Sequence, residues 1–154
     1  MHVAELISVL VLSNQSQLDG EEWVQVIRFF TTEDGGSAFD ELDIPVAMST
    51  TDAWANQLQF SEAFASPNVR IFQAPVDTFQ DWHNAPTRQL CIMLEGIWEI
   101  GTTDGDVRRW GPGEVFMPDT VTGRGHTSRV VEGPVRMVFV PVPDEVDITS
   151  WHID

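Results

Sequence analysis

The chain of 154 residues contains no lysine, and its eight basic residues are all arginines. Against these stand 24 acidic residues, which gives a formal net charge of -16 at pH 7. A negative potential of this size repels the phosphates of nucleic acids and the headgroups of anionic lipids. We therefore expect neither nucleic acid nor a membrane among the partners, and we interpret the acidity as a solvated surface that keeps the protein soluble.

Cysteine is almost absent, because Cys91 is the only one in the sequence. A single cysteine excludes an internal disulfide bond and a cluster of thiolate metal ligands, so a reducing compartment is the simplest inference. Long apolar runs are absent as well. The run from Leu6 to Leu12 is too short to span a bilayer and lacks the basic residues that open a secretory signal. We expect a cytoplasmic protein.

What is present is the composition of one globular domain, with 42% hydrophobic residues and no biased tract. Short alternating or β-branched segments recur at intervals of roughly eight to twelve residues between Gly and Pro turns, a pattern typical of an all-β sandwich or barrel. The predicted strands cover residues 3–12, 22–32, 38–45, 69–74, 78–83, 89–94, 97–102, 107–110, 114–117, 126–131 and 135–142.

Two local features complete this prediction of secondary structure. Glu95-Gly96 is interpreted as a tight turn between two separate strands. A single helix is predicted within residues 48–64, because Trp54 and Leu58 lie four positions apart behind a Ser-Thr-Thr-Asp start that can cap a helix.

Two motifs in this pattern resemble the cupin superfamily. The first runs from Trp82-His83 through Gln89 to Gly96, and the second runs from Gly111-Pro112-Gly113-Glu114 to Gly125-His126. The sequence is similar to small single-domain cupins with a Trp-His-x-Ala-Pro-x-Arg-Gln block and a Gly-Lys-Gly-His block. The resemblance implies a double-stranded β-helix (jelly-roll) barrel over residues 28–142, between an N-terminal strand extension (1–27) and an acidic C-terminal tail (143–154).

The first motif departs from the metal-binding pattern of the family. Metal-binding cupins usually supply two histidines one residue apart, then a glutamate, then a later histidine. Here His83 and His126 match, whereas Ala85 stands in place of the second histidine and Gln89 in place of the glutamate. First-row divalent metals prefer imidazole and carboxylate ligands. His83, Gln89 and His126 therefore form an incomplete site, at which a weakly held iron, manganese, nickel or zinc ion is one hypothesis.

The resemblance also places the side chain of Gln89 inside the barrel. The period-two alternation of a strand then directs Cys91 and Met93 to the same side. A barrel of this size can hold one small ligand. We expect such a ligand to contact these three side chains and Ser128, in addition to His83 and His126.

Three residues near this interior have less specific interpretations. Trp82 precedes His83 and is a candidate for the mouth of the cavity. Arg124 can reach an anionic substrate, although an exposed loop arginine in so acidic a chain is often only a surface ion-pair partner. Cys91 is interpreted as a small buried hydrophobe rather than a nucleophile, because no base lies beside it in the sequence.

Two histidines that face one cavity can take a proton from one position of a substrate and return it at another. Gln89 can donate a hydrogen bond to a developing enolate oxygen. The leading hypothesis is therefore a cupin enzyme, an isomerase, lyase or cyclase, that acts on a small carbonyl compound with His83, Gln89 and His126 as catalytic residues. The alternatives are a metal-dependent dioxygenase, a non-catalytic ligand-binding module, and a filled barrel in which the histidines only satisfy each other or backbone groups.

The N-terminal segment suggests self-association. A strand over residues 3–12, rich in leucine, isoleucine and valine, is an aggregation hazard if it is left as an open edge. Pairing with a second subunit or covering by the tail removes the hazard, so we predict a homodimer.

Overall fold

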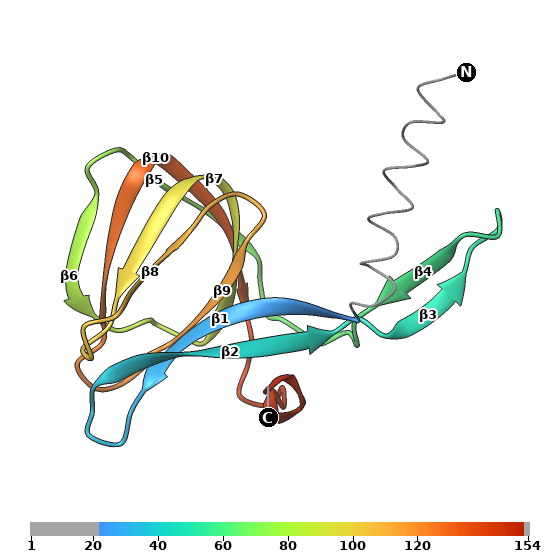
Figure 1. Cartoon of the computed structure of the whole chain (residues 1–154), viewed down its shortest axis with the longest axis horizontal. Helices are drawn as coiled ribbons and strands as arrows, with labels where there is room; N and C mark the ends of the chain where they lie inside the picture. Colours follow the sequence, from blue (N-terminus) through green and yellow to red (C-terminus); the bar gives the residue numbers. More distant parts are fainter. Residues whose placement is uncertain (1–21, 153–154) are drawn as a thin grey trace. The chain divides into compact units, whose positions relative to one another are not determined.

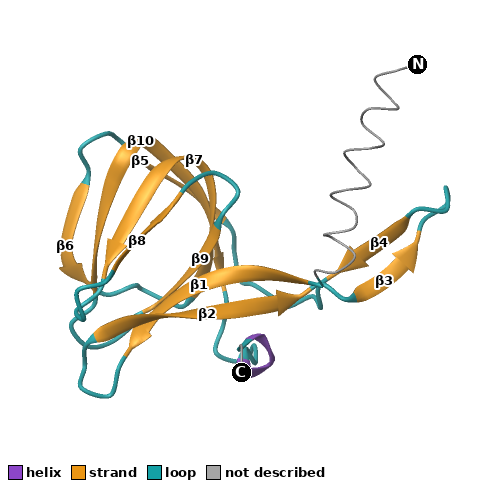
Figure 2. Cartoon of the chain, viewed as in Figure 1, coloured by secondary structure: helices purple, strands orange, loops and turns teal. Residues whose placement is uncertain are grey.

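The computed structural model describes residues 22–152 of the chain. Strands dominate this part, and its only helical element is the short 3-10 turn η1 (Thr149–Trp151) (Figure 2). The prediction of an all-β protein is confirmed. The strand predicted over residues 3–12 lies outside the described residues, which contain no helix long and apolar enough to cross a membrane.

The described chain forms ten strands, which belong to one eight-stranded mixed sheet and one separate hairpin. They are β1 (Trp23–Thr31), β2 (Ser37–Pro45), β3 (Met48–Thr51), β4 (Gln57–Phe60), β5 (Arg70–Ala74), β6 (Phe79–His83), β7 (Gln89–Gly101), β8 (Val107–Trp110), β9 (Val115–Asp119) and β10 (His126–Pro141). The large sheet has the order β2-β1-β9-β7-β10-β5, with β6 paired to β10 and β8 paired to β7 (Figure 1). Within it, β1 and β9 run parallel.

The two longest strands, β7 and β10, pair antiparallel and organise the sheet. The sequence predicted two strands in place of each, with a tight turn at Gly96, and this prediction is wrong. Gly96 has a φ of 82°, and a side chain at this position would collide with the carbonyl oxygens of Glu132 and Pro134. The register of the pair shifts in the same region of β10. The glycine therefore lets a continuous strand bend past an irregularity in its neighbour, as in a β-bulge.

The predicted helix over residues 48–64 is also wrong, because this segment forms the hairpin β3–β4. The carboxylate of Asp52 accepts hydrogen bonds from the backbone N–H groups of Trp54 and Asn56, so the residues that looked like a helix cap build the hairpin turn instead. Residues 57–60, Gln-Leu-Gln-Phe, alternate polar and apolar side chains as a strand does. The hairpin belongs to a smaller compact unit, within Asp43–Glu62, that is separate from the unit holding the candidate site.

The large sheet has one apolar face and one charged face, and β7 shows both. Trp98 and Ile100 are buried in the core. Between them, the carboxylate of Glu99 accepts hydrogen bonds from Arg109 and Arg129 on the neighbouring strands. This alternation is that of a strand with one face on the core and the other in water.

The last described residues pack on the larger unit. The Trp151 ring is buried and lies 6.1 Å from the Phe64 ring, centroid to centroid. Leu42 forms a β-bridge with His152. The guanidinium of Arg88 donates hydrogen bonds to the carbonyl oxygens of Val142, Pro143 and Val146. These contacts hold the C-terminal tail against the sheet.

Candidate functional site

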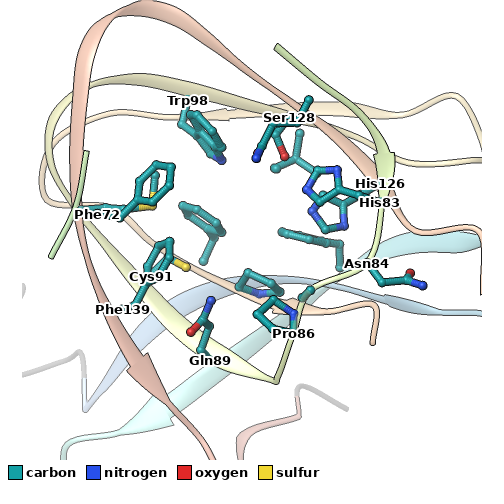
Figure 3. Close-up of a pocket in the computed structure, with 17 residues that line it drawn as sticks. Phe72, His83, Asn84, Pro86, Gln89, Cys91, Trp98, His126, Ser128 and Phe139 are labelled. Carbon is teal, nitrogen blue, oxygen red and sulfur yellow. The ribbon is translucent and has the colours of Figure 1, made fainter. Parts of the chain in front are cut away.

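The apolar face of the sheet lines an open cavity of about 160 Å³. Seventeen residues line it: Phe29, Phe72, Gln80, His83, Asn84, Ala85, Pro86, Gln89, Cys91, Trp98, Ile100, Phe116, Pro118, His126, Ser128, Met137 and Phe139. They come from strands β1, β5, β6, β7, β9 and β10 and from the loop after β6. Figure 3 shows their side chains arranged around an open space.

The two histidines that the sequence singled out lie side by side on this cavity. Strands β6 and β10 pair with His83 opposite His126, and the ring centroids are 4.3 Å apart at an interplanar angle of 55°. Both rings lie at the same wall of the cavity (Figure 3). This geometry places both imidazoles within reach of one small ligand, as a shared site requires.

His126 is the more buried of the two. Its Nδ1 lies 2.7 Å from the hydroxyl oxygen of Thr120, and its ring packs against the Phe29 ring at a centroid distance of 4.6 Å. Burial, together with the neighbouring His83, lowers the pKa of His126 to about 3. The ring is therefore neutral at pH 7, and its Nε2 is left for a ligand.

His83 is held in one tautomer by its own strand. Its Nδ1 lies 2.6 Å from the backbone carbonyl oxygen of Asp81. A carbonyl oxygen can only accept a hydrogen bond, so Nδ1 carries the proton and donates. In the neutral ring, Nε2 is then the atom with a free lone pair, which makes it the proton-accepting atom of this side chain.

Three further predicted residues reach the cavity. Gln89, Cys91 and Ser128 are buried and line it, and the Gln89 amide points toward its open space (Figure 3). Burial raises the pKa of the Cys91 thiol well above its ordinary value. The thiol therefore stays protonated at neutral pH, which favours its interpretation as a small apolar contact rather than a nucleophile.

The structure does not bring Met93, Trp82 and Arg124 to the cavity. Met93 is directed to the apolar side, as strand alternation predicts, but it is buried in the core and is not among the lining residues. Trp82 is half exposed, because it adjoins the inward-facing His83 on β6 and so faces the opposite side. The guanidinium of Arg124 is exposed and lies near the carboxylate of Asp34, 3.9 Å away.

Sequence reasoning missed the aromatic walls and the residue that holds His126. Phe116 and Phe139 are the register partners of Cys91 on the two strands that flank β7. The inward direction of Cys91 therefore implies theirs, but only once the pairing is known. Thr120 follows β9 and carries no signal in the sequence that links it to His126.

The donor set does not fit a complete metal centre. Among residues 22–152, no three His, Cys, Asp or Glu side chains are grouped so that they could hold a metal ion. The cavity offers two imidazoles, the neutral amides of Gln89 and Asn84, and the Cys91 thiol, which burial keeps protonated. First-row metal sites usually combine three or more imidazole, thiolate or carboxylate ligands. We therefore derive no chemical step through a metal.

Comparisons with known proteins do not assign a family. No family model and no curated protein matches the sequence. Among solved structures, the chain is similar to the crystal structure of protein NMB1881 from Neisseria meningitidis, with a TM-score of 0.40 and 17% sequence identity over 53% of this chain and 81% of that one. A similarity this distant supports no functional argument.

Proposed function

We propose that this protein is a cupin-type enzyme that moves a proton within a small carbonyl compound, as an isomerase, lyase or cyclase does. The observation that carries the proposal is the pair of adjacent imidazoles, His83 and His126, with ring centroids 4.3 Å apart on the wall of one cavity. Supporting it, the amide of Gln89 points into the same space.

The proposal includes the jelly-roll architecture of the cupins. Two features support it: a mixed sheet of eight strands with an apolar inner face, and a cavity at the positions of the two sequence motifs. His83 and Gln89 belong to the first motif and His126 to the second, and all three line the cavity.

The environments of the two histidines give them different roles in this proposal. His83 acts as the base, because its Nδ1–H is committed to the Asp81 carbonyl and Nε2 is free to accept the α-proton of the substrate. His126 stays neutral. When the Thr120 hydroxyl donates to Nδ1 of His126, the Nε2–H can donate to the substrate oxygen, as neutral histidines do in enolising enzymes.

The reaction then needs no group beyond these side chains and the substrate. Nε2 of His83 takes the α-proton, the C–H electron pair becomes the enolate, and Gln89 and His126 donate hydrogen bonds to the enolate oxygen. The imidazolium of His83 returns the proton at another carbon in an isomerisation. In an elimination, the electron pair expels a leaving group on the adjacent carbon instead.

Deuterium exchange tests this chemistry without knowledge of the natural substrate. Cyclohexanone and acetophenone are incubated with the protein in D₂O, and loss of the α-proton signals is followed by ¹H NMR. We expect the wild type to accelerate exchange and His83→Gln to lower the rate by about 100-fold or more, the usual contribution of a general base. His152→Gln makes the same change at an exposed histidine of the tail and is expected to leave the rate unchanged.

A non-catalytic binding module is the second candidate. It is favoured by the mainly aromatic and aliphatic walls of the cavity, which can retain a ligand without reacting with it. Absence of exchange with both ketones, combined with binding that His83→Gln leaves intact, would contradict the enzyme and support the module.

The homodimer and the cytoplasmic location stay predictions. Size-exclusion chromatography with light scattering tests the first, and a monomer at micromolar concentration would remove it.

A further inference from the structure

The size of the cavity limits what it can hold. Its volume is about 160 Å³. Pockets for drug-sized ligands have volumes of about 300–1,000 Å³, whereas an apolar protein cavity of about 150 Å³ accommodates one benzene molecule. The walled part of the cavity therefore has room for a single ring with small substituents, and the second ring of a fused compound would project from its opening.

The walls favour a flat ring. Phe72 lies 5.0 Å from Phe139 in a stacked arrangement and 5.7 Å from Trp98 edge to face, centroid to centroid. Phe29 and Phe116, also lining residues, stack with each other at 6.1 Å. Aromatic side chains bind another ring through the same offset and edge-to-face geometries.

The cavity contains no charged partner for a ligand. None of the described residues that line it is an aspartate, glutamate or arginine, although the chain carries 32 such residues, 24 acidic and 8 basic. An ion moved from water into such a site loses its hydration without gaining a counter-charge, which opposes its binding. The net charge of -16 further repels anions.

Three buried polar groups remain for a neutral ligand. The amide of Gln89, the hydroxyl of Ser128 and the indole N–H of Trp98 line the cavity, and none of them is hydrogen-bonded to another described residue. Among the described residues, no buried polar side-chain atom is both sealed from solvent and unpartnered. These groups are therefore accessible from the cavity, where they can bond a hydroxyl or carbonyl oxygen.

The exposed lining residues mark the entrance. Gln80, Asn84 and Pro86 are exposed and lie on β6 or in the loop after it, on either side of His83. Among the described strands, β6 has a single partner, β10. A ligand that enters beside this strand passes His83 and meets the aromatic walls beyond it.

From these observations we propose that the cavity binds an uncharged, planar compound of one ring that carries a carbonyl or hydroxyl group, and that it excludes carboxylates, phosphates and quaternary ammonium ions. The binding preference follows from the lining alone. Its meaning as a substrate class rests on the proposed function.

Four probes separate the contributions of charge and size. Acetophenone is the neutral one-ring carbonyl compound, and benzoate is its near-isosteric anion. Phenyltrimethylammonium is a cation that an aromatic box can attract, and 2-acetonaphthone adds a second ring. Dissociation constants are measured by NMR titration of the full chain at pH 7.5. We expect acetophenone to bind at least about tenfold more tightly than each of the other three.

Two glutamine variants test whether acetophenone binds in this cavity. Gln89→Leu removes the amide at similar size and is expected to weaken acetophenone binding about three- to tenfold, which is the value of one hydrogen bond. Gln59→Leu makes the same substitution on the exposed strand β4 and is expected to change nothing. If Gln89→Leu does not fold, the dissociation constants of the four probes for the wild-type protein still test the proposal.

The outcomes separate the two proposals. Selective binding of acetophenone without deuterium exchange supports this inference and contradicts the enzyme. Exchange that is equally fast for 2-acetonaphthone, or binding of benzoate or phenyltrimethylammonium as tight as that of acetophenone, contradicts this inference even where the enzyme is real. Absence of acetophenone binding at millimolar concentration contradicts it as well.

Discussion

The inner and outer faces of the large sheet are built by the same strands and have opposite chemistry. On β7, Glu99 faces out and binds Arg109 and Arg129, while Trp98 on the preceding position lines the cavity. On β9, Pro118 lines the cavity and Asp119 forms an ion pair with Arg28. Strand alternation thus keeps the acids and arginines of these strands out of the cavity, and within residues 22–152 none of them lines it.

The two faces of the sheet make different contributions to the protein. Exposed ion pairs contribute little to stability, so the outer face mainly keeps the protein in solution. The inner face supplies both the packing energy and the candidate chemistry. Substitutions on the inner face should therefore change stability and ligand binding strongly, whereas those on the outer face should have small effects on stability.

The largest contrast is expected between two phenylalanines. Phe116 is 1% exposed on the inner face, whereas Phe79 is 61% exposed on β6. Phe116→Ala should lower the free energy of unfolding by about 3–5 kcal/mol, because it removes a buried ring and leaves a cavity. Phe79→Ala should cost under about 1 kcal/mol. Urea denaturation measures both, and equal losses would contradict the assignment of the two faces.

The buried histidine should make stability depend on pH. The folded-state pKa of His126 is about 3, below its ordinary value of 6.5, so the unfolded chain binds more protons between these values. The free energy of unfolding should therefore fall as the pH drops from about 6.5 toward 3, by roughly 1 kcal/mol per pH unit from this group. Denaturation of His126→Gln across this range should show a shallower slope, and the same slope as wild type would exclude the effect.

The hydrogen bond that orients His126 can be removed on its own. Thr120 is fully buried, and Thr120→Val replaces its hydroxyl with a methyl group at nearly constant shape. We expect a loss of about 1–3 kcal/mol, because Nδ1 of His126 is left without a partner. Thermal denaturation measures the loss, and Thr87→Val, at an exposed position of the loop between β6 and β7, serves as the matched control. Equal losses in the two variants would show that the bond contributes nothing specific.

The smallest effect is expected on the outer face. Glu99 accepts hydrogen bonds from Arg129 and Arg109, which lower its pKa below its ordinary value of 4.5. Its contribution is therefore complete above that pH and is lost as the pH falls through the lowered pKa. Since both arginines are about half exposed, Glu99→Gln should cost no more than about 1 kcal/mol at pH 7. A loss of 3 kcal/mol would place Glu99 among the structural determinants of the sheet.

The sequence predicted the strands well where their pattern is local. Residues 107–110 match β8, and the strands around His83 and Gln89 begin within a residue of their prediction. The sequence-based prediction failed where contacts with residues distant in the sequence determine the local backbone structure. Gly96 bends β7 because β10 is irregular beside it. Asp52 caps a hairpin turn rather than a helix because the strands on either side of it, β3 and β4, pair with each other.

The same limit applies to the site. Motif order was enough to predict that His83, Gln89 and His126 share one space. It could not separate the roles of the histidines, because those depend on Thr120 and on the Asp81 carbonyl. Nor could it exclude Arg124 from the cavity, since the direction of a loop side chain is not set by strand alternation.

The central claim is that His83 and His126 face one uncharged cavity in distinct states. Histidine-selective ¹⁵N NMR tests it directly, with a titration from pH 8 toward pH 3 in the absence and presence of acetophenone. The account predicts that His126 stays neutral until close to pH 3, that Nδ1 of His83 carries the proton in the neutral ring, and that acetophenone shifts the signals of both but not those of His152. Titration of His126 near pH 6.5, or ligand shifts absent from both rings, would contradict it.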